Sequence, residues 1–214
     1  MRSVDFGDLN SYNDLNLMLS KKVIGAPAPK LLHVDLPGGD GSIDYTEYFG
    51  EIHYENRILT FEFTSLSTPN KFSSDFTRIL NLLNGRRMKI TLSEDPDYYY
   101  IGRITVNEWQ SEKRIGKVVI SVEAEPYKYK SAVTVVSLTA SAKTVINCQN
   151  ARMKVQPKLT FSSDTIVSFG NFSKSLSAGV HIDDDIIFVE GENILTVTPS
   201  SSGVITIEYQ EGDL

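Results

Sequence analysis

The sequence lacks the features that would indicate a disulfide-stabilised, a membrane-spanning or a nucleic-acid-binding protein. Its 214 residues include one cysteine, Cys148, so no internal disulfide can form and the fold does not depend on oxidation. No apolar run approaches the roughly 18 residues that a membrane-spanning helix needs. The 21 basic residues are outnumbered by 27 acidic ones, and a net charge of −6 argues against nucleic-acid binding, because phosphate contacts need a basic face. We therefore expect neither a membrane nor sequence-specific nucleic acid as a partner.

A targeting segment is also missing from the first twenty residues. They include Asp5, Asp8 and Asp14 and no apolar core of signal-peptide length. Hydrophobic content of 41% and charged content of 22% are ordinary for a globular protein. The expectation is a chain that folds in a cytoplasm.

Alternation of apolar and polar residues with a period of two is abundant, and it is the pattern of half-buried strands. Three alternating segments are joined by two polar turns, at residues 93–97 and 111–116, and predict an antiparallel meander. We interpret the chain as mainly β. In the first half the alternation marks strands near residues 15–19, 59–63, 88–92, 98–109 and 118–124.

One segment has helical spacing instead. Its apolar stripe between residues 72 and 84 predicts an amphipathic helix that covers one face of the sheet. Ser73 or Ser74 can cap its start, and Asn84-Gly85 supplies a left-handed stop. The stripe consists of Phe72, Phe76, Ile79, Leu80 and Leu83.

The second half shows short strands at brief spacing, separated by turns rich in Ser, Gly, Asn and Asp. This pattern predicts a β-sandwich or jelly roll. Residues 1–130 carry a net charge of −2 and residues 131–214 a net charge of −4 on fewer charged side chains. We therefore expect two domains, 1–130 and 131–214. The strands of the second are predicted at 133–138, 144–148, 158–161, 165–169, 186–189, 194–198 and 204–209.

Candidate catalytic and metal-binding residues are sparse. The three histidines, His33, His53 and His181, have no metal-ligand spacing, and each is interpreted as an ordinary strand residue. Asp183-Asp184-Asp185 could suggest calcium, but calcium loops alternate their carboxylates around a sharp glycine turn. Cys148 lacks a nucleophile signature, and no Gly-x-Ser-x-Gly elbow is present. We expect no enzyme activity, no metal and no cofactor.

Two carbohydrate-related alternatives remain open. Asp95 and Asp97 flank Pro96 and could form a glycosidase carboxylate pair, although Asp-Pro-Asp between strands is usually a turn. Trp109 and Tyr98-Tyr99-Tyr100 could stack on sugar. Alternation places Tyr99 opposite its neighbours, so core or interface packing is the favoured interpretation.

A glycine-rich turn is the most distinctive local motif. Pro37 presets its own φ, and Gly38, Gly39 and Gly41 can adopt positive φ without steric cost. No Lys-Ser/Thr and no helix pattern follow Asp40, so the segment is not a phosphate loop. We predict that Pro37, Gly38, Gly39, Asp40 and Gly41 form a structural turn that positions backbone.

The order of motifs along the chain resembles that of the distal tail proteins of siphophages. These motifs are this turn, Tyr48-Phe49-Gly50, Arg57 before Phe61-Glu62-Phe63, and the helix at 72–84. The likeness covers essentially the whole chain and extends to Gly191-Glu192-Asn193-Ile194-Leu195 and the closing Ile205–Tyr209 segment. The family often has a basic residue within the glycine turn, where this chain has Gly39.

The resemblance implies a structural virion protein without enzymatic activity. Such proteins form a homo-hexameric ring that joins the tail tube protein to the tail-tip protein, and the amino-terminal domain makes the ring. Their carboxyl-terminal domain is a galectin-like or carbohydrate-module-like sandwich that often docks receptor-binding components. The implied location is the virion tail, after assembly in the host cytoplasm. The alternative is a carbohydrate-binding or adhesion module that acts through the carboxyl-terminal sandwich.

Three arginines are candidates for the interface between subunits. Arg57 precedes a strand, and Arg86 and Arg87 follow the predicted helix. Arg suits bidentate contacts at interfaces, so one or more of these residues is predicted to form an intersubunit ion pair. The alternative interpretation is a solvated strand end and helix terminus.

Overall fold

The computed structural model describes residues 2–48, 50–112 and 114–214, and the chain divides into two compact units. The N-terminal unit ends at Lys128, and the C-terminal unit comprises Tyr129–Leu214. Both are mainly β, which confirms the predicted fold class. Among the described residues, no helix is both long and apolar enough to cross a membrane.

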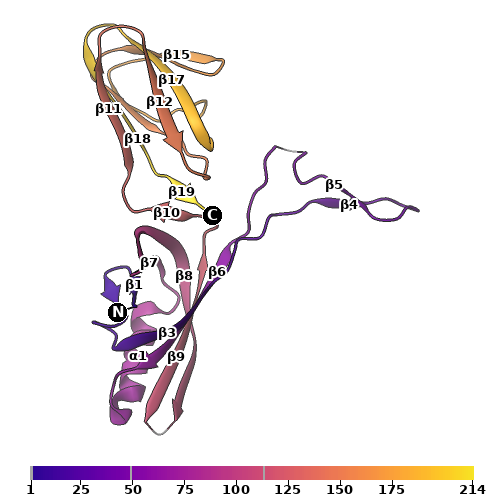
Figure 1. Cartoon of the computed structure of the whole chain (residues 1–214), viewed down its shortest axis with the longest axis vertical. Coiled ribbons are helices and arrows are strands. Elements are labelled where there is room, and N and C mark those ends of the chain that lie inside the picture. Colours follow the sequence, from indigo (N-terminus) through magenta and orange to yellow (C-terminus); the bar gives the residue numbers. More distant parts are fainter. Residues whose placement is uncertain (1, 49, 113) are drawn as a thin grey trace. The chain divides into compact units, whose positions relative to one another are not determined.

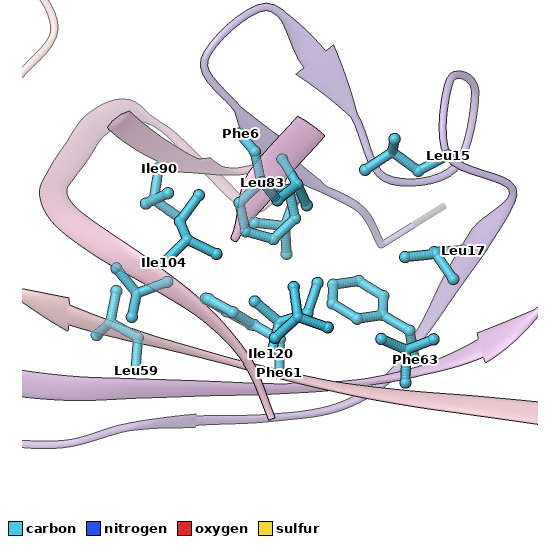
Figure 2. Close-up of a cluster of buried hydrophobic side chains, with 14 of the residues drawn as sticks. Phe6, Leu15, Leu17, Leu59, Phe61, Phe63, Leu83, Ile90, Ile104 and Ile120 are labelled. Carbon is cyan, nitrogen blue, oxygen red and sulfur yellow. The ribbon is translucent and has the colours of Figure 1, made fainter. Parts of the chain in front are cut away.

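An antiparallel sheet forms the body of the N-terminal unit, with strand order β2-β1-β7-β8-β9-β6-β3 (Figure 1). Its central strands alternate strictly, so that one face is apolar and buried. Figure 2 shows this core, in which Phe6 meets Phe61 and Phe63 edge to face. The strands are β1 (Val4–Phe6), β2 (Leu9–Asn10), β3 (Leu17–Ile24), β6 (Arg57–Ser65), β7 (Arg87–Leu92), β8 (Asp95–Glu112) and β9 (Ile115–Ala124).

The single α-helix of the described residues, α1 (Phe72–Leu83), lies where the apolar stripe predicted it and buries Phe72, Ile79 and Leu83. The predicted serine cap is wrong. A 3₁₀ turn, η1 (Pro69–Lys71), starts the helical path earlier, and Lys71 occupies the cap position with no side-chain cap bond. Proline is favoured at such a start because its φ is already helical. The helix ends at Leu83, Asn84 is its cap residue, and Gly85, which follows, has a φ of +77°.

The meander is confirmed, but its first turn is shorter than predicted. β7 and β8 pair down to Leu92 and Asp95, so the turn is only Ser93-Glu94 and the Asp95-Pro96-Asp97 segment belongs to β8. β8 and β9 extend into the predicted turn at 111–116, of which residue 113 lies outside the described residues. A bulge near Asn107 shifts the register of β8, so Trp109 pairs with buried Val118.

The C-terminal unit is a β-sandwich of two four-stranded antiparallel sheets, ordered β11-β18-β13-β16 and β12-β17-β14-β15. Both sheets contribute to one core, in which Phe161, Phe188, Leu195 and Ile207 are buried. The strands are β11 (Thr134–Ala140), β12 (Thr144–Asn150), β13 (Lys158–Phe161), β14 (Thr165–Phe169), β15 (Phe172–Leu176), β16 (Gly179–His181), β17 (Gly191–Pro199) and β18 (Gly203–Tyr209); two short strands, β10 (Lys128–Lys130) and β19 (Gly212–Asp213), also occur.

One predicted strand of the sandwich is wrong. Residues 186–189 do not form a strand; Phe188 makes a single bridge to Val155 and inserts its ring into the core. Ile186 and Phe188 fill the interior between the sheets, whereas Ile187 and Val189 are exposed. The sequence analysis also missed β15 and β16, whose residues are largely exposed and so show little alternation.

Candidate interaction surfaces

A two-stranded hairpin separates β3 from β6 in the sequence. Its strands, β4 (His33–Asp35) and β5 (Ser42–Asp44), form a sheet of their own. The glycine-rich segment links them: the Gly39 N–H donates to the Leu36 carbonyl at 3.1 Å, and Gly38 has a φ of +78°. Proline followed by a positive-φ glycine at the two central positions is the sequence signature of a type II turn. We call residues 26–56 the arm.

The register of the arm divides its side chains between two faces. Val34 lies opposite Ile43, whereas His33 lies opposite Asp44 and Asp35 opposite Ser42. Alternation places the remaining apolar residues on the Val34 side. One face is therefore apolar and the other polar. The apolar face consists of Leu32, Val34, Leu36, Ile43 and Tyr45.

Among the described residues of the N-terminal unit, none covers the apolar face. Leu32, Val34, Leu36 and Ile43 are all exposed, and 72% of Tyr48 is accessible to solvent. Tyr45 and Tyr48 meet edge to face at 5.5 Å and, with Leu32 and Val34, line a shallow hollow. Contiguous exposed apolar surface of this kind marks an interaction site. An isolated two-stranded hairpin is also only marginally stable in water, so contact with another surface would stabilise it.

The arm also carries most of the net charge of the protein. It has six acidic side chains and one basic side chain, Lys30, a net charge of −5 against −6 for the chain. Hydrogen bonds from the side chain and backbone of Thr46 hold the pKa of Asp44 below its ordinary value, with His33 adding a weaker effect. The acidic residues are Asp35, Asp40, Asp44, Glu47, Glu51 and Glu55.

Arg57 anchors the two ends of the arm, near Gly25 and Arg57, which we call the root of the arm. Only 7% of this residue is exposed, and its Nε donates to the Gly25 carbonyl at 2.7 Å while Nη1 donates to the Pro126 carbonyl at 3.2 Å. The guanidinium also lies 5.5 Å from the ring centre of Tyr100. Gly25 approaches β6 so closely that a Cβ would lie 2.7 Å from the Ile58 carbonyl oxygen. Arg57 thus joins the first and last residues around the arm to the meander.

Arg86 and Arg87 belong to a cationic region at the exposed side of β7 and β8. Arg87 lies directly opposite Arg103, and Lys89 follows two residues along β7. Arg86 donates to the Asn81 carbonyl near the end of the helix, and Arg87 pairs with Glu125. We call Arg86, Arg87, Lys89 and Arg103 the cationic patch. The sequence analysis found two of its members and missed the others, because only the strand register brings β7 and β8 together.

Aromatic residues considered for sugar stacking are used in packing. Trp109 stacks on Phe76 at 5.0 Å, so it fixes the helix to the sheet. Cations cover the three tyrosines of β8: Lys128 lies 4.0 Å from the Tyr98 ring centre, Lys89 lies 4.2 Å from that of Tyr99, and Arg57 covers Tyr100. Each of these rings therefore has a cation of the same chain over one face.

The C-terminal unit has one tyrosine after residue 131, and it is internal. Tyr209 is 3% exposed, its hydroxyl donates to the Gln149 carbonyl at 2.5 Å, and burial with nearby Cys148 and Glu211 raises its pKa to about 12. Burial also raises the pKa of the Cys148 thiol, which lies in the sandwich core. Neither side chain is placed to bind a sugar or to act as a nucleophile.

Two of the acidic candidates, Asp95 and Asp183, have lysine partners. Asp95 pairs with Lys128 at 3.2 Å. Asp183 accepts a hydrogen bond from Lys174 at 2.7 Å, which lowers the Asp183 pKa and raises the Lys174 pKa. Among residues 2–48, 50–112 and 114–214, no three His, Cys, Asp or Glu side chains gather as metal ligands would. These carboxylates contribute to turn and strand geometry.

A polar hollow lies on the face of the N-terminal sheet that is turned away from its core. Glu62, Lys117 and Gln110 are among its lining residues. Glu62 forms an ion pair with Lys21 at 2.8 Å on the edge strand β3. This face carries short hydroxyl side chains and charges of both signs, and these groups do not converge as catalytic groups would.

Comparison with known proteins agrees with the fold. The sequence matches no protein-family model and no curated protein. The structure is similar to that of the phage SPP1 Dit protein, described as a paradigm of the hub adsorption apparatus in phages that infect Gram-positive bacteria. The TM-score is 0.72 at 13% sequence identity, and the match covers 98% of this chain and 99% of the SPP1 chain. The chain therefore has a Dit-like fold, as the resemblance predicted.

Proposed function

We propose that this protein is a structural component of a phage tail, a hub that joins the tail tube to the tail tip and to host-adsorption components. The observation that carries the proposal is the extent of the structural likeness, which includes both units and leaves almost no part of either chain unmatched. A shared fold by itself does not define a function. The surfaces of this chain supply the second argument.

Those surfaces suit assembly better than catalysis. The arm exposes a contiguous apolar face, whereas the aromatic and acidic candidates for chemistry are engaged in packing or ion pairs. A closed ring requires two different, complementary faces on each subunit. We assign the arm and the exposed face of the sheet in the N-terminal unit to these two roles, in a homo-hexameric ring made by that unit.

The C-terminal sandwich is proposed to dock the adsorption components, such as a receptor-binding protein. Its outer faces carry scattered exposed apolar residues, among them Val145, Ile166 and Ile194. Direct binding of carbohydrate receives less support, because the only tyrosine after residue 131 is buried. The proposed location is the virion tail, with assembly in the host cytoplasm.

Assembly is the property to measure. The purified chain is examined by light scattering and negative-stain microscopy, alone and mixed with the tube and tip proteins of its phage. We expect rings with six times the mass of one chain, and antibodies against the chain should label the distal end of the tail. A strict monomer that also fails to assemble with tube and tip proteins would contradict the proposed function.

A further inference from the structure

Two edge strands of the C-terminal sandwich are long, regular and uncharged. β11 ends one sheet and β12 ends the other, and each pairs with its neighbour over all seven of its residues. Neither strand contains a charged residue, a proline or a glycine, and neither ladder, described at all seven pairs, contains a bulge. Natural edge strands usually carry one of these features, because a free row of N–H and C=O groups otherwise pairs with another strand.

The edge strands at the other ends of the two sheets differ. β15 and β16 are shorter, with five and three residues. Lys174 lies at the centre of β15, and Gly179 begins β16 with a φ of +132°. A lysine, a short strand and an irregular backbone each keep an edge from pairing. The contrast marks the ends formed by β11 and β12 as the place where a further strand can be added.

The backbone of β12 is available along most of its length. In an antiparallel sheet, alternate residues of an edge strand direct their N–H and C=O groups away from the sheet. Among the described residues, one bond from outside the ladder reaches this backbone: the Tyr209 hydroxyl donates to the Gln149 carbonyl at 2.5 Å, near the end of the strand. A strand of seven residues offers an edge about 24 Å long.

The surface beside this edge is uncharged and partly apolar. Val145 is 63% exposed and lies opposite Thr196, and Asn147 lies opposite Ile194. Glu192, near one end, is the one charged residue among the seven described pairs of this ladder. A partner segment without charges at its centre fits here, because burying an unpaired charge is costly.

The interior between the two sheets is incompletely covered at the same place. Val136 and Leu138 of β11 pack against the core but are only partly buried, whereas Ile146 and Cys148 of β12 are buried. The orders β11-β18-β13-β16 and β12-β17-β14-β15 place consecutive strands at matching positions, so β11 and β12 lie at the same side of the sandwich. A strand added beside β12 would extend its sheet over β11 and remove this apolar surface from water.

We propose that an extended, uncharged segment of another tail protein pairs with the free edge of β12 as a fifth strand of its sheet. A second copy of this chain fits less well. The free edges lie at one side, so two copies would meet across a two-fold axis, whereas neighbours in a six-membered ring are related by a rotation of about 60°. The edge therefore stays free within one ring. This inference rests on the proposed function and adds the docking edge and its backbone pairing.

Lysines placed on the edge test the pairing. The edge variant carries Val145→Lys with Asn147→Lys, and the probes are the purified tip protein and receptor-binding protein of the same phage. Surface plasmon resonance measures their binding to the full chain. We expect the wild type to bind one of them and the edge variant to have a dissociation constant at least about tenfold higher. Amide hydrogen exchange of residues 144–150 should slow in the wild-type complex, because pairing engages the backbone.

A matched control separates the edge from the face of the sheet. Ile166→Lys with Ser173→Lys makes the same change in charge on exposed residues of β14 and β15, on the same outer face but away from β12. This face variant should bind as tightly as the wild type. Circular dichroism and thermal melting verify that each chain is folded. Light scattering measures in parallel whether each chain forms rings with the tube and tip proteins.

Edge pairing would be overturned, with the tail-hub function intact, by any of three results from chains that still form rings. The first is binding that is absent in the wild type or equal in the edge variant. The second is loss of binding in the face variant, which would assign docking to the face of the sheet. The third is a doubled ring mass that the edge variant abolishes, which would make a second copy the occupant. A folded wild-type chain that forms no ring, with or without tube and tip proteins, would overturn the function as well.

Discussion

Arg87 on β7 and Arg103 on β8 lie directly opposite each other in the antiparallel register, and both are exposed. Each has another contact within its own subunit: Arg87 pairs with Glu125, and Arg103 donates to the Gly85 carbonyl at 2.6 Å. The pairing of two cations across a ladder costs stability in an isolated subunit. The ion pair with Glu125 and the hydrogen bond to Gly85 offset part of that cost within the chain.

Arg103→Gln should separate stability from assembly. The amide keeps a donor for Gly85 and removes the like-charge neighbour, so we expect the unfolding free energy of the monomer to change by less than about 1 kcal/mol. Assembly should weaken, because the patch loses a charge. Denaturant titration and light scattering measure the two effects, with Lys143→Gln, on an exposed lysine of the C-terminal unit, as control. A marked loss of monomer stability would show that Arg103 is chiefly structural.

Arg57→Lys should loosen the root of the arm. Lysine keeps the charge but cannot reach the Gly25 and Pro126 carbonyls with a planar fork, so one or both bonds are lost. We expect the N-terminal unit to lose about 1.5–3 kcal/mol, the usual value for hydrogen bonds to charged groups. Limited proteolysis should cut faster near residues 25 and 57. Arg2→Lys, on an exposed side chain, is the control and should have no effect.

Gly25→Ala should disturb the same root by a steric route. Its Cβ would lie 2.7 Å from the Ile58 carbonyl oxygen, which no rotamer change relieves because the clash is with backbone. We expect destabilisation of about 1–3 kcal/mol together with weaker assembly. Gly39→Ala is the matched control within the arm, since its Cβ would make an ordinary 3.4 Å contact with Leu36. Equal melting temperatures for the two variants would refute the steric argument.

The pKa of Glu211 predicts how the stability of the C-terminal sandwich changes at acidic pH. Burial tends to raise the pKa of this carboxyl, but hydrogen bonds from Thr134 and Lys130 outweigh burial and hold the pKa below its ordinary value of 4.5. The unfolded chain therefore binds the proton more readily, so the stabilisation is complete above about pH 4.5 and is lost as the pH falls through the folded-state pKa.

Glu211→Gln should reduce this acid dependence and cost about 1 kcal/mol at neutral pH through a weakened ion pair with Lys130. Unfolding free energies of both proteins between pH 3 and pH 7, roughly the range over which carboxylates titrate, provide the measurement. Glu190→Gln, on an exposed carboxylate of the same unit, serves as the control. Parallel pH profiles for the wild type and Glu211→Gln would be inconsistent with the assigned role.

The periodic parts of the fold could be predicted because their signal is local. The stripe from Phe72 to Leu83 and the strands at 158–161 and 165–169 appear in the structure with almost the same bounds. Each depends on side chains that are only a few residues apart in sequence and that helix or strand geometry places on the same face. The glycine turn was predictable for the same reason, but the apolar residues placed symmetrically around it went unrecognised.

Tertiary structure determined the positions of some side chains that the alternation of apolar and polar residues does not predict. A bulge at Asn107 turns Trp109 toward the helix, and Phe188 fills the sandwich core without belonging to a strand. Bulges and insertions of this kind depend on partner strands far along the chain, and local sequence carries little record of them.

Composition, period and turn chemistry determined by themselves that this protein is mainly β, lacks a disulfide and contains one amphipathic helix in its first half. Only the folded chain decided that Arg57 is internal, that Arg87 faces Arg103, and that the arm has one apolar face. The physical reason is that these relations depend on cross-strand register, which brings together residues whose separation in sequence no local preference encodes.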